Sequence, residues 1–175
     1  MEQHNISVLI AEDELEKKIC ELAAQISKDY AGSEYVKLIC ILKGSAFFAC
    51  ELAKRITVPV MMDFMQASSY GAGTVSSGKI NIKKELDEGI DGEDVIIVED
   101  IIDSGNTLSR LIPLLESRGP KSVKICTMLN KPERREVEID IAYNGFVIPD
   151  KFVVGFGLDF NQRYRNLPYI GVVHL

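Results

Sequence analysis

The stretch VIIVEDIIDSGNTL, at residues 95–108, constrains the fold of this chain more than any other segment. Its first apolar run predicts a buried strand, which we expect to end where Glu99 and Asp100 begin. Two more apolar residues then lead into a small polar turn at 103–107, directly before a predicted helix. In an open parallel sheet, ligands bind beyond the carboxyl ends of the strands. The segment therefore predicts an α/β fold with a binding site at this turn.

The remaining segments alternate between the two kinds of element. Apolar residues from Leu15 to Ile26 follow helical spacing and predict a first helix that ends near Gly32. Further strands are expected at 36–42, 58–70, 79–86, 94–99 and 122–129, further helices at 44–56 and from 108 with a kink at Pro113, and short apolar segments at 151–157 and 169–175. This order indicates a mostly parallel central sheet flanked by helices on both faces. With 46% hydrophobic residues, the 175 residues predict a single domain, 1–175.

Charge and composition narrow the class of protein. The net charge of -6 argues against a surface that coats nucleic acid, because such binding needs clustered Lys and Arg. The N-terminus lacks a basic region followed by an apolar core, and Lys43 interrupts the longest apolar stretch, so we expect a cytoplasmic protein without a membrane segment. The four cysteines lie in apolar contexts without a CxxC pair, which predicts buried, reduced thiols: Cys20, Cys40, Cys50 and Cys126.

The polar turn and the two acids suit different parts of one ligand. Free N–H groups, small hydroxyls and a helix N-terminus favour a phosphate monoester. The carboxylates of Glu99 and Asp100 repel phosphate but accept hydrogen bonds from a vicinal diol. A phosphate beside a diol describes a ribose 5-phosphate. A simple N-cap turn with solvated acids is the alternative, and it explains most isolated SGNT stretches.

The same stretch resembles the phosphoribosyl pyrophosphate (PRPP) signature of type I phosphoribosyltransferases. Other segments resemble hypoxanthine phosphoribosyltransferases in the same order: LKGS (42–45), SSYG (68–71), NKPERR (130–135), IPDKFVVGFGLDF (148–160) and YRNLPY (164–169). The resemblance covers nearly the whole chain. It implies the type I fold, with a small hood built from the chain ends and a flexible flap.

The resemblance also implies roles for the residues around the turn. Glu99 and Asp100 would bind the ribose hydroxyls, directly or through Mg²⁺. The 5-phosphate would be bound by Asp103, Ser104, Gly105, Asn106 and Thr107. Asp103 is also the expected general acid/base at the purine N7.

Pyrophosphate and metal positions follow in the same way. Lys43 and Gly44 match the pyrophosphate loop of the family, in which a cis peptide precedes the lysine. Arg165 would supply a second cation, and Asp159 would hold Mg²⁺, an ion that suits an all-oxygen set of ligands.

For the base, the resemblance assigns Lys131 as the donor to the 6-oxo group, Phe152 as the stacking ring and the Val153 backbone as the reader of the purine edge. Ser69 and Tyr70 would begin the flap that closes over PRPP. The implied activity is purine salvage: transfer of 5-phosphoribosyl from PRPP to N9 of hypoxanthine, and also guanine. Homodimers or homotetramers are expected.

Two other functions would fit parts of the sequence. A PRPP-sensing regulator that binds RNA or protein could keep this fold, but the acidic net charge and the retained Lys131, Phe152 and Asp159 argue against it. A P-loop kinase is suggested by GxxxxGK at 73–79, yet Ile80 stands where that motif needs Ser or Thr, and a strand is predicted to follow.

A few positions depart from the family pattern or carry no expected role. Asn106 stands where some members of the family carry Lys, and Pro113 falls within the helix that follows the turn. No catalytic role is expected for His4 or His174.

Overall fold

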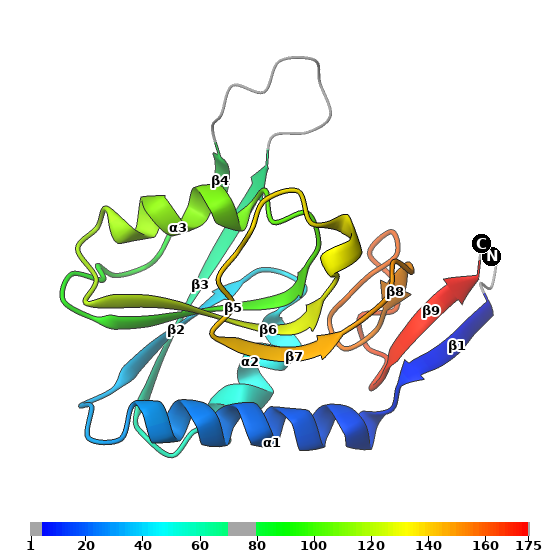
Figure 1. Cartoon of the computed structure of the whole chain (residues 1–175), viewed down its shortest axis with the longest axis horizontal. Helices are drawn as coiled ribbons and strands as arrows, with labels where there is room; N and C mark the ends of the chain where they lie inside the picture. Colours follow the sequence, from blue (N-terminus) through cyan, green and yellow to red (C-terminus); the bar gives the residue numbers. More distant parts are fainter. Residues whose placement is uncertain (1–4, 70–79, 175) are drawn as a thin grey trace.

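The computed structural model describes residues 5–69 and 80–174. Tyr70, His4 and the P-loop match at 73–79 therefore lie outside the described residues. The chain folds around a six-stranded sheet, and a small three-stranded sheet stands at one end of it (Figure 1). Helices cover both faces of the large sheet, as predicted. The helices are α1 (Glu12–Asp29), α2 (Ala46–Ala53), α3 (Leu108–Glu116) and the short 3₁₀ helix η1 (Pro132–Arg134).

The large sheet has the strand order β4-β3-β2-β5-β6-β7. Its strands are β2 (Val36–Ile41), β3 (Val60–Ser69), β4 (Ile80–Lys84), β5 (Asp94–Ile102), β6 (Ser122–Asn130) and β7 (Tyr143–Val147). Every pair is parallel except β3 with β4, so the predicted mostly parallel sheet is confirmed. Ile80 begins a strand rather than a helix, in agreement with the rejection of the P-loop.

The core consists of two apolar layers, one on each face of the sheet. Because side chains alternate along a strand, Leu38 and Cys40 of β2 pack toward α1 and α2, while Ile39 and Ile41 pack toward α3. On α1, every buried side chain lies on one helical face: Leu15, Ile19, Leu22, Ala23 and Ile26. The spacing that predicted this helix is the spacing that fills the core.

Three features differ from the sequence expectations. β5 does not end at Glu99 but continues through Ile102, because Ile102 is buried and pairs with Asn130 of β6. β1 and β7 were not predicted. Cys20 and Cys50 are exposed, contrary to the prediction of four buried thiols, because each lies on the outward face of its helix directly after a buried residue.

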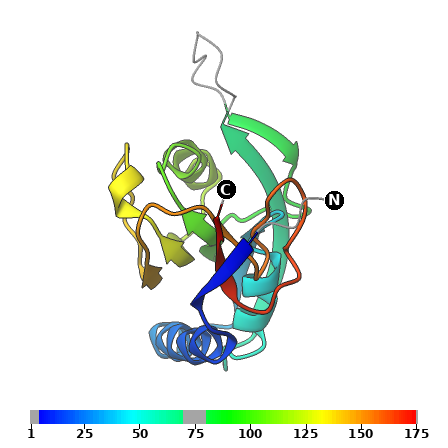
Figure 2. The same cartoon turned by 90° about the vertical axis from the view of Figure 1, so that its right-hand side faces the viewer.

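The chain ends build the small sheet. β1 (Asn5–Ile10) and β9 (Ile170–His174) pair antiparallel, with Asn5 opposite His174, and β8 (Val153–Val154) pairs with the other edge of β9. Figure 2 turns this sheet toward the viewer. The predicted hood is confirmed. The imidazole Nε2 of His174 lies 2.7 Å from Ser7 Oγ, and His174 is exposed.

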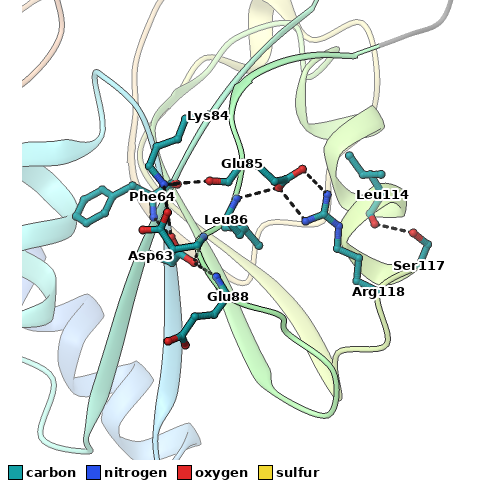
Figure 3. A network of polar contacts seen from close by, with 10 residues as sticks. Asp63, Phe64, Lys84, Glu85, Leu86, Glu88, Leu114, Ser117 and Arg118 are labelled. Atoms are coloured by element: carbon teal, nitrogen blue, oxygen red, sulfur yellow. Dashed lines mark hydrogen bonds and ion pairs between the residues drawn. The ribbon is translucent and has the colours of Figure 1, made fainter.

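A buried acid connects β3 to the segment that follows β4. The Asp63 side chain is only 5% exposed, and it accepts hydrogen bonds from the backbone N–H groups of Phe64 at 2.7 Å and Asp87 at 3.0 Å (Figure 3). Nearby, Arg118 at the end of α3 donates two 2.9 Å hydrogen bonds to the carboxylate of Glu85. This network fixes the chain as it returns from β4 to β5.

Among the residues that the structure describes, no helix is both long and apolar enough to cross a membrane.

Candidate active site

A cavity of about 310 Å³ opens at the carboxyl ends of β2 and β5. Its lining comes from the end of β2 and the loop after it, from β3, from the end of β5, from the turn before α3 and the start of α3, and from the loop before β9. The predicted site residues in this lining are Lys43, Gly44, Glu99, Asp100, Asp103, Ser104, Gly105, Thr107, Asp159 and Arg165. Residues predicted for phosphate, ribose, pyrophosphate and metal thus converge from distant parts of the sequence.

Two adjacent carboxylates form the floor of the cavity. Glu99 is buried, and burial followed by repulsion from Asp100 raises the pKa of its carboxyl group well above the ordinary value. Burial also raises the pKa of Asp100 to about 6, although the nearby Arg165 opposes this shift. The two acids therefore lie where a cation or a hydrogen-bond donor would be favoured.

Glycines allow the loops to approach these acids closely. A Cβ atom on Gly44 would overlap Oδ2 of Asp100, and one on Gly157 would overlap the carbonyl oxygen of Gly44. The peptide bond between Leu42 and Lys43 is cis, as the family resemblance implies. The loop after β2 is therefore packed directly on the carboxylate of Asp100.

The turn before α3 is held by hydrogen bonds from residues 135–137. The Arg135 guanidinium donates to the carbonyl oxygens of Asp103 at 3.1 Å and Ile102 at 3.3 Å. The N–H groups of Glu136 and Val137 both donate to the carbonyl oxygen of Ser104, at 2.9 and 3.1 Å. These contacts provide donors for three successive carbonyl groups, those of Ile102, Asp103 and Ser104.

Gly105 has the positive φ of 84° that such a tight turn requires, and a Cβ there would overlap the carbonyl oxygen of Val137. Asn106 is placed differently from the other turn residues. Its side-chain Nδ2 donates to Glu136 at 2.6 Å, and Asn106 does not line the cavity. The geometry of its side chain thus gives no support to the predicted contact with phosphate.

Two cations line the same cavity as the acids. Arg165 is held by a 2.8 Å ion pair with Asp159 and by a 2.6 Å hydrogen bond to the carbonyl oxygen of Gly157. Lys43 is exposed, and its ammonium donates to Oε1 of Gln162 at 3.3 Å. Two positive side chains and two adjacent carboxylates therefore share one cavity.

The predicted base-binding residues lie outside this cavity, beside it. The Lys131 side chain is 7% exposed, with its Nζ 3.0 Å from the carbonyl oxygen of Lys151 and 3.5 Å from Oδ1 of Asp150. Phe152 is 48% exposed, and the ring of Phe160 meets it edge-on at 5.4 Å between centroids. Exposure of an aromatic ring beside a buried amine leaves a face on which a flat base can stack.

Val153 and Ser69 belong to strands. Val153 is buried in β8, where it pairs with Val172 of β9. Ser69 is the last residue of β3 and pairs with Ile80. Tyr70, the other predicted flap residue, is among the residues not described.

A chain of charges connects the turn to the base side. Oδ1 of Asp103 is buried without a hydrogen bond, and the Nε atom of Arg134 lies 3.5 Å from it. Arg134 also lies 3.7 Å from Asp150, which is itself next to Lys131. Two side chains, Arg134 and Asp150, thus connect the predicted general acid/base Asp103 to the predicted base-binding Lys131.

The comparisons with known proteins agree with this geometry. A family model described as the phosphoribosyl transferase domain matches residues 9–161. The chain belongs to the phosphoribosyl transferase family. It is 51% identical over 175 residues to a hypoxanthine phosphoribosyltransferase of Salmonella typhimurium, covering 99% of this chain and 98% of the relative.

Solved structures give the same result for the fold. A hypoxanthine phosphoribosyltransferase from Staphylococcus aureus matches with a TM-score of 0.91 and 46% identity, covering 96% of this chain and 91% of that one. The Trypanosoma cruzi enzyme matches with a TM-score of 0.92 and 36% identity, covering 99% and 94%. The type I phosphoribosyltransferase fold is therefore confirmed.

The acids of this phosphoribosyl transferase suit Mg²⁺. Within 5–69 and 80–174 no three His, Cys, Asp or Glu side chains form a ready metal cluster. Mg²⁺, however, commonly uses one or two carboxylates and completes its shell with water and substrate oxygens. The carboxyl group of Asp100 has a raised pKa, to which the nearby Asp159 contributes after burial. A divalent cation near these two acids would relieve that repulsion.

Sequence reasoning missed several residues that shape this transferase site. Arg135, Arg134 and Asp150 all lie in segments that resemble the family, but nothing in their spacing marks them as partners of the turn or of Lys131. Gln162 falls between two such segments and carried no signal, because its contacts depend on how the loop folds.

Proposed function

We propose that this transferase is a hypoxanthine phosphoribosyltransferase of purine salvage. It would transfer the 5-phosphoribosyl group of PRPP to N9 of hypoxanthine, and of guanine, to give the nucleoside monophosphate and pyrophosphate. The observation that carries the proposal is the arrangement of one cavity: a small polar turn, two adjacent acids and two cations, in a chain half identical to such enzymes over its full length.

The turn and the floor would take the ribose 5-phosphate. Ser104, Gly105 and Thr107 line the cavity at the start of α3, where helix N–H groups favour an anion. Glu99 and Asp100 would accept hydrogen bonds from the ribose hydroxyls. Their negative charge would also stabilise the positive, oxocarbenium-like sugar of the transition state.

Pyrophosphate would leave toward Lys43 and Arg165. Both cations line the cavity that holds the acids, so the departing negative charge would meet positive charge. Asp100 and Asp159 would hold Mg²⁺, with Glu99 close by. Bound there, the ion would offset the charge of pyrophosphate and of the acids.

The base would stack on Phe152 with its 6-oxo group near Lys131. As N9 bonds to C1′ of the ribose and the bond from C1′ to the pyrophosphate oxygen breaks, the base must lose a proton. Asp103 is the group that would accept it from N7. Its carboxylate is connected to Lys131 through Arg134 and Asp150, which supports a position near the bound base.

A spectrophotometric assay with PRPP and Mg²⁺ tests the proposal, with hypoxanthine, guanine, xanthine and adenine compared. We expect turnover of hypoxanthine and guanine. In Asp103→Asn, kcat should fall roughly 100-fold or more, because a general acid/base contributes about that much. A circular dichroism melt of the variant checks that the fold survives.

The opposite outcome is also informative. Tight PRPP binding by calorimetry without turnover of any base would contradict the enzyme and favour a PRPP-sensing regulator. Unchanged kcat in Asp103→Asn would remove Asp103 from the chemical step.

We also propose a homodimer or homotetramer. Phe47 on α2 is 45% exposed, and an exposed aromatic on a helix surface is a common contact between subunits. Light scattering behind gel filtration measures the mass directly, and a monomer at micromolar concentration would contradict this part of the proposal.

A further inference from the structure

The turn at Phe160–Arg163 carries a glutamine in a backbone conformation that favours glycine. Phe160 and Arg163 exchange backbone hydrogen bonds of 3.1 and 3.0 Å, and between them Asn161 and Gln162 have φ values of 50° and 63°. Two-residue turns with two positive φ values prefer Asn followed by Gly. Asn161 fits this preference and Gln162 does not. The conformation of the turn therefore does not explain the glutamine.

The side chain of Gln162 connects the two cations of the cavity. Its Oε1 atom accepts a hydrogen bond from Lys43 Nζ and another from the Arg165 guanidinium, each at 3.3 Å. Lys43 follows β2, so the glutamine joins segments more than 100 residues apart. One neutral oxygen thus lies between two positive groups.

The rest of the loop fixes one cation more firmly than the other. Asp159 accepts from the Gln162 N–H at 2.7 Å and pairs with Arg165 at 2.8 Å. Arg165 is also bound to the Gly157 carbonyl, so it stays in place without the glutamine side chain. Lys43 is exposed and flexible by nature, and Gln162 restrains it beside Arg165.

We propose that Gln162 is a positioning residue for pyrophosphate. Its side-chain carbonyl oxygen holds Lys43 next to Arg165 and occupies the position that a phosphate oxygen would take between the two cations. When pyrophosphate binds, a phosphate oxygen replaces the glutamine oxygen there. A neutral acceptor serves this role because it orders the cations without cancelling their charge. The inference rests on the proposed function, since it takes Lys43 and Arg165 as the groups that meet pyrophosphate.

Binding of inorganic pyrophosphate with Mg²⁺, measured by calorimetry on the whole protein, tests the proposal. Gln162→Glu places a carboxylate between the cations and should weaken binding roughly tenfold or more. Gln162→Gly relaxes the turn but removes the bridge, so it should weaken binding about threefold while the melting temperature stays equal or rises. That combination separates positioning from a structural role, which would lower stability and binding together.

Asn161→Asp is the matched control, because it adds the same charge one residue away in the same turn. It should change pyrophosphate affinity by less than about twofold, since an exposed charge is screened by solvent. In steady-state kinetics, KM for PRPP should rise in Gln162→Glu while KM for hypoxanthine stays unchanged.

Three results would overturn the inference alone: wild-type affinity in Gln162→Glu, equal weakening in Asn161→Asp, or unchanged pyrophosphate binding in a more stable Gln162→Gly. A wild-type protein that binds no pyrophosphate would overturn the proposed function, and this inference with it.

Discussion

At the scale of single residues, the site depends on groups that approach one another without room for a further atom. Gly44 lies directly against the Asp100 carboxylate, and Gly157 lies directly against the Gly44 carbonyl. The loops that carry the cations can therefore pack against Asp100 and against each other only because two glycines leave room for them. This dependence can be tested at each glycine separately.

Replacing Gly44 with Ala should reduce kcat/KM for PRPP about 100-fold, because the new Cβ overlaps Asp100 and displacement by about 1 Å can have that effect. The free energy of unfolding should also fall by about 1 to 3 kcal/mol, as it does at other overpacked sites. Steady-state kinetics and urea unfolding measure the two effects.

Gly89→Ala is the control for this substitution, because a Cβ at Gly89 meets no atom within 4 Å. Equal losses of kcat/KM in Gly44→Ala and Gly89→Ala would show that overlap with Asp100 is not the cause of the lower activity.

Arg135→Lys should raise KM for PRPP by roughly tenfold, because one amine cannot replace the fork that holds two carbonyl groups of the turn. Kinetics with PRPP varied at saturating hypoxanthine measures this. Arg118→Lys makes the same exchange at the exposed pair with Glu85 and should leave KM for PRPP unchanged. If KM for hypoxanthine rose as much as KM for PRPP, Arg135 would have a general structural role instead.

At the scale of elements, local sequence patterns predicted those strands and helices whose apolar residues repeat regularly. α1 and β2 followed directly from spacing. β7 did not, because Asn144 and Gly145 interrupt its apolar residues; Gly145 is needed where the strand passes close to the Met128 carbonyl. The end of β5 was also missed, since pairing with β6, rather than its own acids, decides its length.

The site shows the same difference between residues that a local sequence pattern identifies and residues that depend on contacts between distant segments. Residues within the PRPP signature could be assigned from the sequence, because a short segment contains the whole turn. Arg135 and Gln162 could not, because their partners lie far away in sequence and only the folded loops bring them together.

The hairpin of β3 and β4 offers a test at this scale. Asp63→Ala should lower the free energy of unfolding by about 2 kcal/mol, because it removes a buried acceptor and leaves the backbone N–H groups of Phe64 and Asp87 without their hydrogen-bond partner. Glu85→Ala, in the same network but exposed, should cost less than about 1 kcal/mol. Urea unfolding of both variants measures the difference, and similar losses would contradict the assigned importance of burial.

At the scale of the whole molecule, two apolar layers pack on the two faces of one sheet. The reactivity of the four thiols shows whether the layer under α1 and α2 is closed. Cys40 and Cys126 lie in the layer under α1 and α2, on β2 and β6. Burial raises the pKa of the Cys40 thiol to about 11, and it also raises the pKa of Cys126. Both groups are thus protected by packing and by protonation.

At pH 7 a maleimide should modify Cys20 and Cys50 in the native protein, while Cys40 and Cys126 should react only as the chain unfolds. Peptide mapping by mass spectrometry after timed labelling measures each thiol. In increasing urea the two buried thiols should become reactive together, because one core layer holds both. Labelling of either at the rate of Cys20 in the native state would show that the layer opens locally.

The pairing of Asn5 with His174 has a mechanical consequence. Because β1 and β9 are antiparallel and both chain ends leave from the same end of the pair, a pulling force on the two ends would separate the ladder one hydrogen bond at a time, like a zipper. The large sheet would at first carry none of that load. Stretching the molecule between its ends should therefore open the hood at low force, while the floor of acids and the turn remain folded.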